Sequence, residues 1–217
     1  MADFLQWPTT IDEARNIQLK LRDSVIRHTE LSDVHRVAGV DVGFEHGGVI
    51  TRAAVVVLNF PDLTVHEKAI ARAKTRFPYI PGYLSFRETP AVLEALGQLQ
   101  CMPDLILCDG QGLAHPRRFG IACHIGVLTG VPTVGVAKSR LIGEYEEPCE
   151  EKGSWSPLTH QGETIGAVLR TRSHVKPLFV SIGHKVDLNT AIEFTLQCTS
   201  RYRLPETTRW AHKLASG

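Results

Sequence analysis

Apolar residues recur with two different periods along the chain, and these periods predict where helices and strands lie. From Thr10 to Arg27 they recur every three or four residues, which predicts an amphipathic helix with Thr9 or Thr10 as its N-cap. An apolar run that ends at Asp41 is followed by a Gly47-Gly48 turn and the β-branched run Ile50 to Leu58, which predicts a hairpin. A third antiparallel strand with a cationic exposed face is predicted over residues 63–75.

The second half of the chain alternates between helical patterns and short apolar runs. Buried strands are predicted at Leu105 to Cys108 and Thr133 to Ala137, and two late strands over residues 164–170 and 178–181. The polar segment Glu144 to Gly162 contains prolines and glycines and is expected to be an irregular surface excursion. Helices are expected around residues 92–99, 116–129, 187–198 and 207–214. This order predicts one α/β domain over residues 1–217 with a mixed sheet.

Composition narrows the possible functions only slightly. With 217 residues and 43% hydrophobic content, the chain can bury one substantial core. Its 24 Lys and Arg nearly balance 23 Asp and Glu, so a nucleic-acid-binding surface would have to be local. The five cysteines form no CxxC pair, which favours a reducing, cytoplasmic compartment over a disulfide framework or a zinc site. The longest apolar stretch is interrupted by Pro132, which argues against a membrane span.

Three acidic residues are the candidates for chemistry. Asp41 and Asp109 each stand where an apolar run meets a glycine-containing turn, so both could converge at one edge of an α/β sheet and hold Mg²⁺. The alternative is that each forms an ordinary turn. Glu88 fits a capping box with Ser85, but it could equally lie just before a helix that begins at Thr89. The residues alone leave these alternatives open.

Six motifs in fixed order resemble the bacterial endonuclease V family, whose members nick DNA near deoxyinosine. The resemblance implies a ribonuclease-H-like fold, with Asp41 on the first strand, Asp109 at the end of the fourth and Glu88 near the start of the intervening helix. The motifs are Val-Ala-Gly-Val-Asp41-Val-Gly-Phe, Phe77-Pro-Tyr-Ile-Pro-Gly82, Leu84-Ser-Phe-Arg-Glu88, Asp109-Gly-Gln-Gly-Leu-Ala-His-Pro116, Val134-Gly-Val-Ala-Lys138 and Arg203-Leu-Pro-Glu-Thr-Thr-Arg209.

The resemblance implies a catalytic role for Asp41, Glu88 and Asp109 as ligands of Mg²⁺, for which Mn²⁺ is a plausible substitute, and for Lys138 facing the scissile backbone. His212, where some relatives carry aspartate, would bind the metal directly, bridge to it through water or shape the site. Tyr79 is expected to act as a strand-separating wedge on the stiff loop formed with Pro78, Ile80 and Pro81. Base-pocket candidates are Gly82, Leu84, Gly112 and Leu141, and phosphate-binding candidates are Arg87, His115, Arg117, Arg118, Lys138 and Arg140, flanked by Arg72, Lys74 and Arg76.

The function implied is hydrolysis of the second phosphodiester bond on the 3′ side of a deaminated purine, leaving a 3′-hydroxyl and a 5′-phosphate. The expected partner is DNA containing deoxyinosine, with inosine-containing RNA as an open alternative, and the expected state is a monomer with no membrane contact. Two other functions are weighed. A non-catalytic inosine-binding protein would keep the pocket without a working metal site. An actin-like phosphotransferase would use Asp41-Val-Gly43 as a phosphate turn, but it requires two related lobes.

Overall fold

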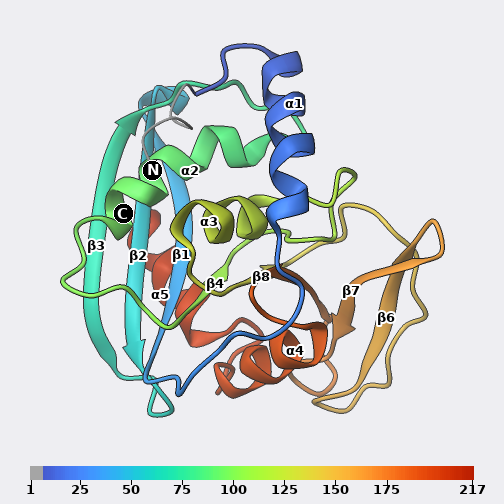
Figure 1. The fold of residues 1–217 in the computed structure, drawn as a ribbon. Helices are drawn as coiled ribbons and strands as arrows, with labels where there is room; N and C mark the ends of the chain where they lie inside the picture. Colours follow the sequence, from blue (N-terminus) through green and yellow to red (C-terminus); the bar gives the residue numbers. More distant parts are fainter. Residues whose placement is uncertain (1–6) are drawn as a thin grey trace.

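A single mixed sheet forms the centre of the computed structural model, which describes residues 7–217 (Figure 1). The strand order is β3-β2-β1-β4-β5-β8-β7-β6. β1, β2 and β3 are antiparallel, β4 and β5 run parallel to β1, and β8, β7 and β6 are antiparallel again, so the predicted ribonuclease-H-like arrangement is confirmed. The strands are β1 (Arg36–Glu45), β2 (Ile50–Asn59), β3 (Val65–Lys74), β4 (Leu105–Cys108), β5 (Thr133–Ala137), β6 (Trp155–His160), β7 (Glu163–Leu169) and β8 (Leu178–His184).

Helices cover both faces of this sheet, because its central strands are apolar on both sides. In β1, Ala38 and Val40 pack with α2 and α3, whereas Val37 packs with α4 and α5 on the opposite face. No helix within residues 7–217 is long and apolar enough to cross a membrane. The helices are α1 (Ile11–Leu21), α2 (Leu84–Leu96), α3 (Ile121–Thr129), α4 (Leu188–Gln197) and α5 (Glu206–Ala215).

Two glycines of β1 allow α5 to lie directly on the strand. A Cβ atom at Gly39 would come within 2.0 Å of the Thr207 carbonyl oxygen, and one at Gly43 within 2.4 Å of the Ala215 carbonyl oxygen. Successive side chains of a strand point to opposite faces, so Asp41, which lies between these glycines, shares their face. Because α5 lies this close to β1, side chains of α5 can reach Asp41.

Several predicted boundaries differ from the structure. Residues 155–160 form β6, which the sequence assigned to an irregular excursion because Pro157 weakens the strand pattern; β6 is the edge strand, where proline is tolerated. The predicted helix over 116–129 begins only at Ile121, after Gly120, whose backbone passes too close to the Gln111 carbonyl for a side chain. The first helix ends at Leu21 and continues as one 3₁₀ turn over Arg22–Ser24.

α2 begins earlier than either sequence alternative for Glu88 assumed. Its N-cap is Tyr83, so neither a Ser85 capping box nor an N-cap at Thr89 is correct, and Glu88 lies inside the helix together with Pro90. Proline has no N–H, so the Phe86 carbonyl, four residues before Pro90, loses its helical partner. The indole Nε1–H of Trp7 donates to this carbonyl at 2.6 Å instead. A residue near the N-terminus thus completes the hydrogen bonding of the helix that carries Glu88.

Replacement of Trp7 by phenylalanine tests this contact. The ring of Phe would keep much of the packing against Phe86, but the Phe86 carbonyl would lose the hydrogen bond from the indole, so we expect the free energy of unfolding to fall by about 1–3 kcal/mol. Urea unfolding followed by circular dichroism measures the change. A loss below about 0.5 kcal/mol, the usual range for surface substitutions, would contradict this role.

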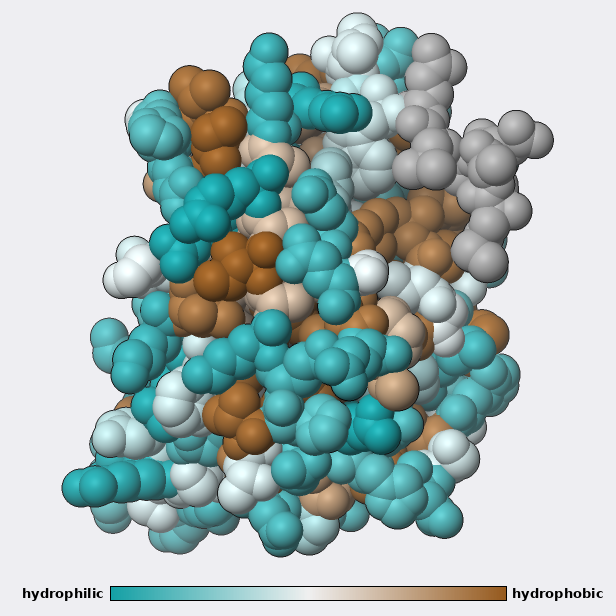
Figure 2. Space-filling view, turned by 90° about the vertical axis from the view of Figure 1, so that its left-hand side faces the viewer, coloured by the Kyte–Doolittle hydropathy of each residue, from teal (hydrophilic) through white to brown (hydrophobic). Residues whose placement is uncertain are grey.

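The β3 edge is hydrophilic. Figure 2 looks onto this side of the molecule, and hydrophilic side chains dominate it. Lys68, Arg72 and Lys74 are exposed on β3, which confirms the predicted cationic face. Charged side chains on an edge strand oppose pairing with the edge of another sheet.

Candidate active site

Asp41 and His212 form one side of the candidate site. Asp41 lies in the middle of β1, not at its end as the sequence indicated, because β1 continues to Glu45. His212 lies on α5, and its Nδ1 atom is 2.7 Å from the Asp41 carboxylate. The close packing of α5 on β1 explains how two residues 171 positions apart meet.

Asp109 follows β4 directly, as predicted, at the end that parallel strands commonly use for ligands. Its carboxylate forms an ion pair with the Lys138 ammonium group, which follows β5. Burial raises the pKa of Asp109, and the nearby Asp41 charge raises it as well, while Lys138 opposes the shift. Because β4 and β5 are neighbours in the sheet, Asp109 and Lys138 reach the same edge.

Glu88 approaches from α2, on the other side of the sheet. It lines a small cavity together with Asp41 and Asp109. Burial raises the pKa of Glu88 to about 8, and the charges of Asp41 and Asp109 add to this rise. Three carboxylates held this close repel one another, and a bound cation would relieve that repulsion.

The side chains present fit a hard divalent cation. One ligand atom from each of Asp41, Asp109 and His212 lies within 4.8 Å of the others, the single grouping of this kind among residues 7–217. Glu88 lies outside this group of three, but it lines the same small cavity as Asp41 and Asp109. Carboxylate oxygens are the ligands that Mg²⁺ and Mn²⁺ prefer, whereas an imidazole nitrogen is a softer donor for these ions.

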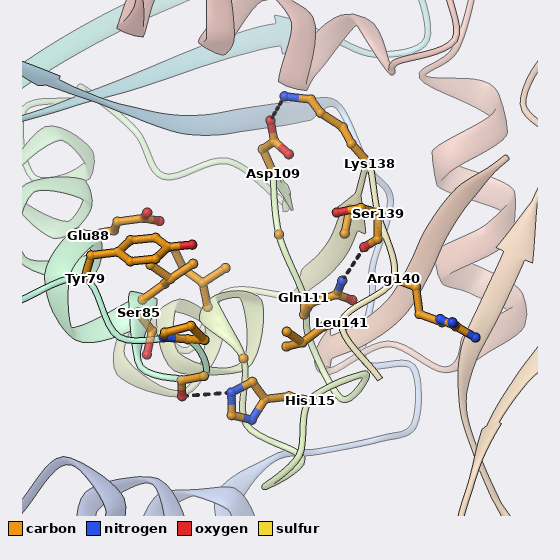
Figure 3. Close-up of a pocket in the computed structure, with 17 residues that line it drawn as sticks. Tyr79, Ser85, Glu88, Asp109, Gln111, His115, Lys138, Ser139, Arg140 and Leu141 are labelled. Carbon is orange, nitrogen blue, oxygen red and sulfur yellow. Dashed lines mark hydrogen bonds and ion pairs between the residues drawn. The ribbon is translucent and has the colours of Figure 1, made fainter. Parts of the chain in front are cut away.

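A larger pocket of about 370 Å³ opens beside the carboxylates. Figure 3 shows Tyr79 and Leu141 on opposite walls, with Asp109 and Lys138 at one end and His115 at the other. Of the predicted base-pocket residues, Gly82, Leu84 and Leu141 line it. Gly112 does not, because it packs against the Ile182 carbonyl in the interior. The remaining lining residues are Pro81, Ser85, Glu88, Gly110, Gln111, Gly120, Ile121, Ala137, Ser139 and Arg140.

Two features of this pocket were missed by the sequence reasoning. The Gln111 side-chain nitrogen donates to the Ser139 carbonyl at 3.0 Å, which leaves its Oε1 atom without a hydrogen-bond partner. The start of α2 has no side-chain N-cap to bond its first-turn N–H groups, and its first two residues, Leu84 and Ser85, line the pocket. A signal for Gln111 was available, since it stands inside the Asp109–Pro116 motif.

The loop that carries Tyr79 is anchored by its other apolar residues. Phe77 and Tyr83 are buried in an aromatic cluster, and Ile80 packs against it. Tyr79 is 67% exposed and lines the pocket with Pro81, whereas Pro78 is exposed outside it. The Tyr79 ring is therefore the aromatic side chain of this loop that projects into solvent, and the buried neighbours hold the loop in place.

The predicted phosphate-binding residues fall into two groups. Lys138 and Arg140 line the pocket, whereas Arg87 is not among its lining residues and has its guanidinium 4.2 Å from the centre of the Phe44 ring. The others are engaged inside the protein. Arg118 forms an ion pair with Glu163 at 2.7 Å, and the side chains of His115 and Arg117 bond the Gly82 carbonyl. Of the flanking stripe, Arg72 pairs with Glu45, while Lys74 and Arg76 are exposed.

The sequence and the fold match one family of known proteins over most of the chain. The family model described as endonuclease V matches residues 19–213. An endonuclease V from Trichormus variabilis is 63% identical over 211 residues, which cover 97% of this chain and 96% of the relative. The crystal structure of endonuclease V from Streptomyces avermitilis has 49% sequence identity and a TM-score of 0.93, covering 97% of this chain and 93% of that one.

A further solved structure contains nucleic acid. It is an endonuclease V from Ciona intestinalis in complex with a 23mer DNA that contains an inosine followed by a ribo-adenosine. Sequence identity is 30% and the TM-score is 0.83, with 95% of each chain covered. Sequence and fold therefore agree over nearly the whole length, and this chain belongs to the endonuclease V family.

Proposed function

We propose that this protein is a divalent-metal-dependent endonuclease that recognises a deaminated purine in DNA and cuts the second phosphodiester bond on its 3′ side. The observation that carries the proposal is the cluster of Asp41, Asp109 and His212 at the mouth of a pocket large enough for a purine base. Mg²⁺ is the proposed cation, with Mn²⁺ as a substitute. The proposed products are a 3′-hydroxyl and a 5′-phosphate, and the proposed working unit is one catalytic domain acting as a monomer.

Each side chain of the cluster has a part in this reaction. Asp41, Asp109 and Glu88 would hold the cation, which, when bound, activates water and neutralises charge on the leaving oxygen. His212, bonded to Asp41, fixes the orientation of that carboxylate. The Lys138 ammonium group would exchange its partner, Asp109, for a phosphate oxygen of the substrate once the carboxylate is engaged. Closely spaced carboxylates without a cation repel phosphate, so these residues act only together with the metal.

The pocket supports recognition of hypoxanthine. This base presents an acceptor, O6, next to a donor, N1–H, and adenine presents the reverse pattern at these positions. The first-turn N–H groups of α2 at Leu84 and Ser85 suit O6, and Gln111, whose Oε1 atom is buried without a partner beside the pocket, would turn that atom toward N1–H. A base that enters this pocket must leave its stack, and Tyr79 would occupy the space it vacates.

The alternative functions fit less well. An actin-like phosphotransferase requires two related lobes, but residues 7–217 form one sheet without a second phosphate turn. A non-catalytic inosine-binding protein does not require the carboxylates to remain close together, yet Asp41 and Asp109 share the cluster with His212.

A nicking assay on matched substrates tests the proposed function. Duplexes that differ only by one inosine, made in DNA and in RNA, would be incubated with Mg²⁺ or with EDTA, and the product ends mapped on a denaturing gel. We expect a single nick at the second phosphodiester bond 3′ to inosine, directly after the nucleotide that follows it, only with metal. Equal cleavage of the inosine-free duplex, or cleavage in EDTA, would overturn the proposal, and the RNA duplex reveals whether a 2′-hydroxyl is tolerated.

A further inference from the structure

One backbone carbonyl at the base of the Tyr79 loop receives three side-chain hydrogen bonds. The Gly82 oxygen accepts from Gln18 Nε2 at 3.0 Å, from His115 Nε2 at 2.9 Å and from Arg117 Nη2 at 2.6 Å. Gly82 has a φ of 81°, a conformation that favours glycine, and a Cβ atom there would lie 3.0 Å from the Arg117 guanidinium. The Tyr79 loop thus ends at Gly82 in a backbone conformation that favours glycine, with the His115 and Arg117 side chains directly beside it.

The three donors are themselves fixed by further bonds. Gln18 is fully buried on α1, where its Oε1 atom accepts from Arg117 Nε at 2.5 Å and its Nε2 atom also donates to the Phe119 carbonyl at 3.3 Å. The Arg117 guanidinium also lies 4.1 Å from the centre of the Tyr83 ring. A buried glutamine whose amide oxygen and nitrogen are both engaged holds its orientation strongly.

The protonation state of His115 fits the same arrangement. Burial, together with the Arg117 charge, lowers the pKa of His115 to about 4, so the imidazole is neutral near pH 7. Its Nδ1 atom accepts from the Arg117 backbone N–H at 3.2 Å, which leaves the proton on Nε2, the atom that donates to Gly82. A neutral ring directed at a carbonyl offers no positive charge to a phosphate.

We infer that Gln18, His115 and Arg117 form a clamp on the Gly82 carbonyl, and that this clamp holds the Tyr79 loop rigid so that it can open a duplex. The clamp residues are positioning residues, not phosphate contacts. The inference rests on the proposed function, because it assigns the rigidity of the loop to strand separation. The clamp also uses the lone pairs of the Gly82 carbonyl, so Gly82 contributes space to the pocket and not an acceptor.

The physical need for rigidity arises only on paired substrates. In a duplex, insertion of Tyr79 must offset the free-energy cost of unpairing and unstacking the target base. A flexible loop holds the ring between the bases less firmly, so it offsets less of that cost. A single strand presents no pair to open. Loosening the clamp should therefore impair nicking of a duplex far more than nicking of a single strand, whereas a general loss of stability would impair both alike.

The test compares Gln18→Leu and Arg117→Lys with Ile192→Ala. Leucine matches glutamine in size but bonds nothing, and lysine keeps the charge of Arg117 without its planar fork. Ile192 is buried on α4 in a core cluster that contains no residue of α1 or of the Tyr79 loop, so its truncation lowers stability without touching the clamp. Nicking rates would be measured on one inosine-containing strand, single and annealed, and hydrogen exchange on the peptide covering residues 77–83.

We expect each clamp variant to slow duplex nicking by about tenfold, the cost of losing its hydrogen bond to the Gly82 carbonyl, with less than about a threefold effect on the single strand. Exchange in residues 77–83 should rise in both variants and not in Ile192→Ala. Unchanged exchange, or an equal duplex-to-single-strand ratio in all three variants, would overturn the clamp. If the wild-type protein nicks neither strand form, the proposed function fails, and the exchange measurement still decides whether the clamp exists.

Discussion

Asp109→Asn should abolish strand nicking while leaving the protein able to bind inosine-containing strands. The substitution keeps the shape of the side chain but removes one negative charge from a cluster whose remaining members are Asp41 and His212. Removal of a group that stabilises charge in the transition state costs several kcal/mol, so we expect the rate to fall by about 1000-fold or more. Asp41→Asn should behave in the same way, because Asp41 supplies the opposite side of the cluster.

The measurement separates binding from chemistry. Fluorescence anisotropy of a labelled inosine-containing strand in Ca²⁺ reports binding, and the nicking rate in Mg²⁺ reports the reaction. Asp62→Asn is the matched control, since Asp62 is an exposed acidic residue outside the site, and it should nick at the wild-type rate. Wild-type nicking by Asp109→Asn would refute the assigned metal site. Binding of inosine by the wild-type protein without any nicking would favour the non-catalytic alternative.

Tyr79→Ala should slow duplex nicking by about 10- to 100-fold, since stacking of one base on an aromatic ring contributes about 1–3 kcal/mol. The effect on unfolding should stay within about 0.5 kcal/mol, because Tyr79 is 67% exposed and its loop is anchored by Phe77 and Ile80 instead. Tyr79→Phe keeps the ring and should retain most of the activity.

Tyr202→Ala provides the control for this prediction. Tyr202 is also an exposed tyrosine, at 45%, but it lies outside the pocket. Both variants would be assayed on a duplex and on the corresponding single strand, with stability followed by urea unfolding. A Tyr79→Ala protein that nicks the duplex as fast as Tyr202→Ala does would show that the ring is not a wedge.

The clamp and the metal cluster differ in how directly the sequence reveals them. Ala14, Gln18 and Leu21 share the buried face of α1, so a polar residue stands where the pattern calls for an apolar one. Such a residue indicates a buried hydrogen-bond partner but does not identify it, since Gly82 and Phe119 are 64 and 101 residues away. The same limit applied to Glu88, whose place depended on where α2 begins.

What the sequence determined by itself was local. The apolar periods gave the helices and most strands, because burial of one face follows directly from residue spacing, and the ordered motifs identified the family resemblance together with Asp41, Glu88 and Asp109. The edge strand β6 escaped this reasoning, because Pro157 obscures a strand that only an unpaired edge permits.

The tertiary structure decided which side chains meet. Glycines at positions 39 and 43 let α5 settle on β1 and carry His212 to Asp41, the Trp7 indole replaces the hydrogen bond that Pro90 removes from α2, and Gly82 receives donors from two distant segments. Each of these contacts joins residues far apart along the chain. Their geometry follows from packing between whole elements, which the spacing of residues within one element does not specify.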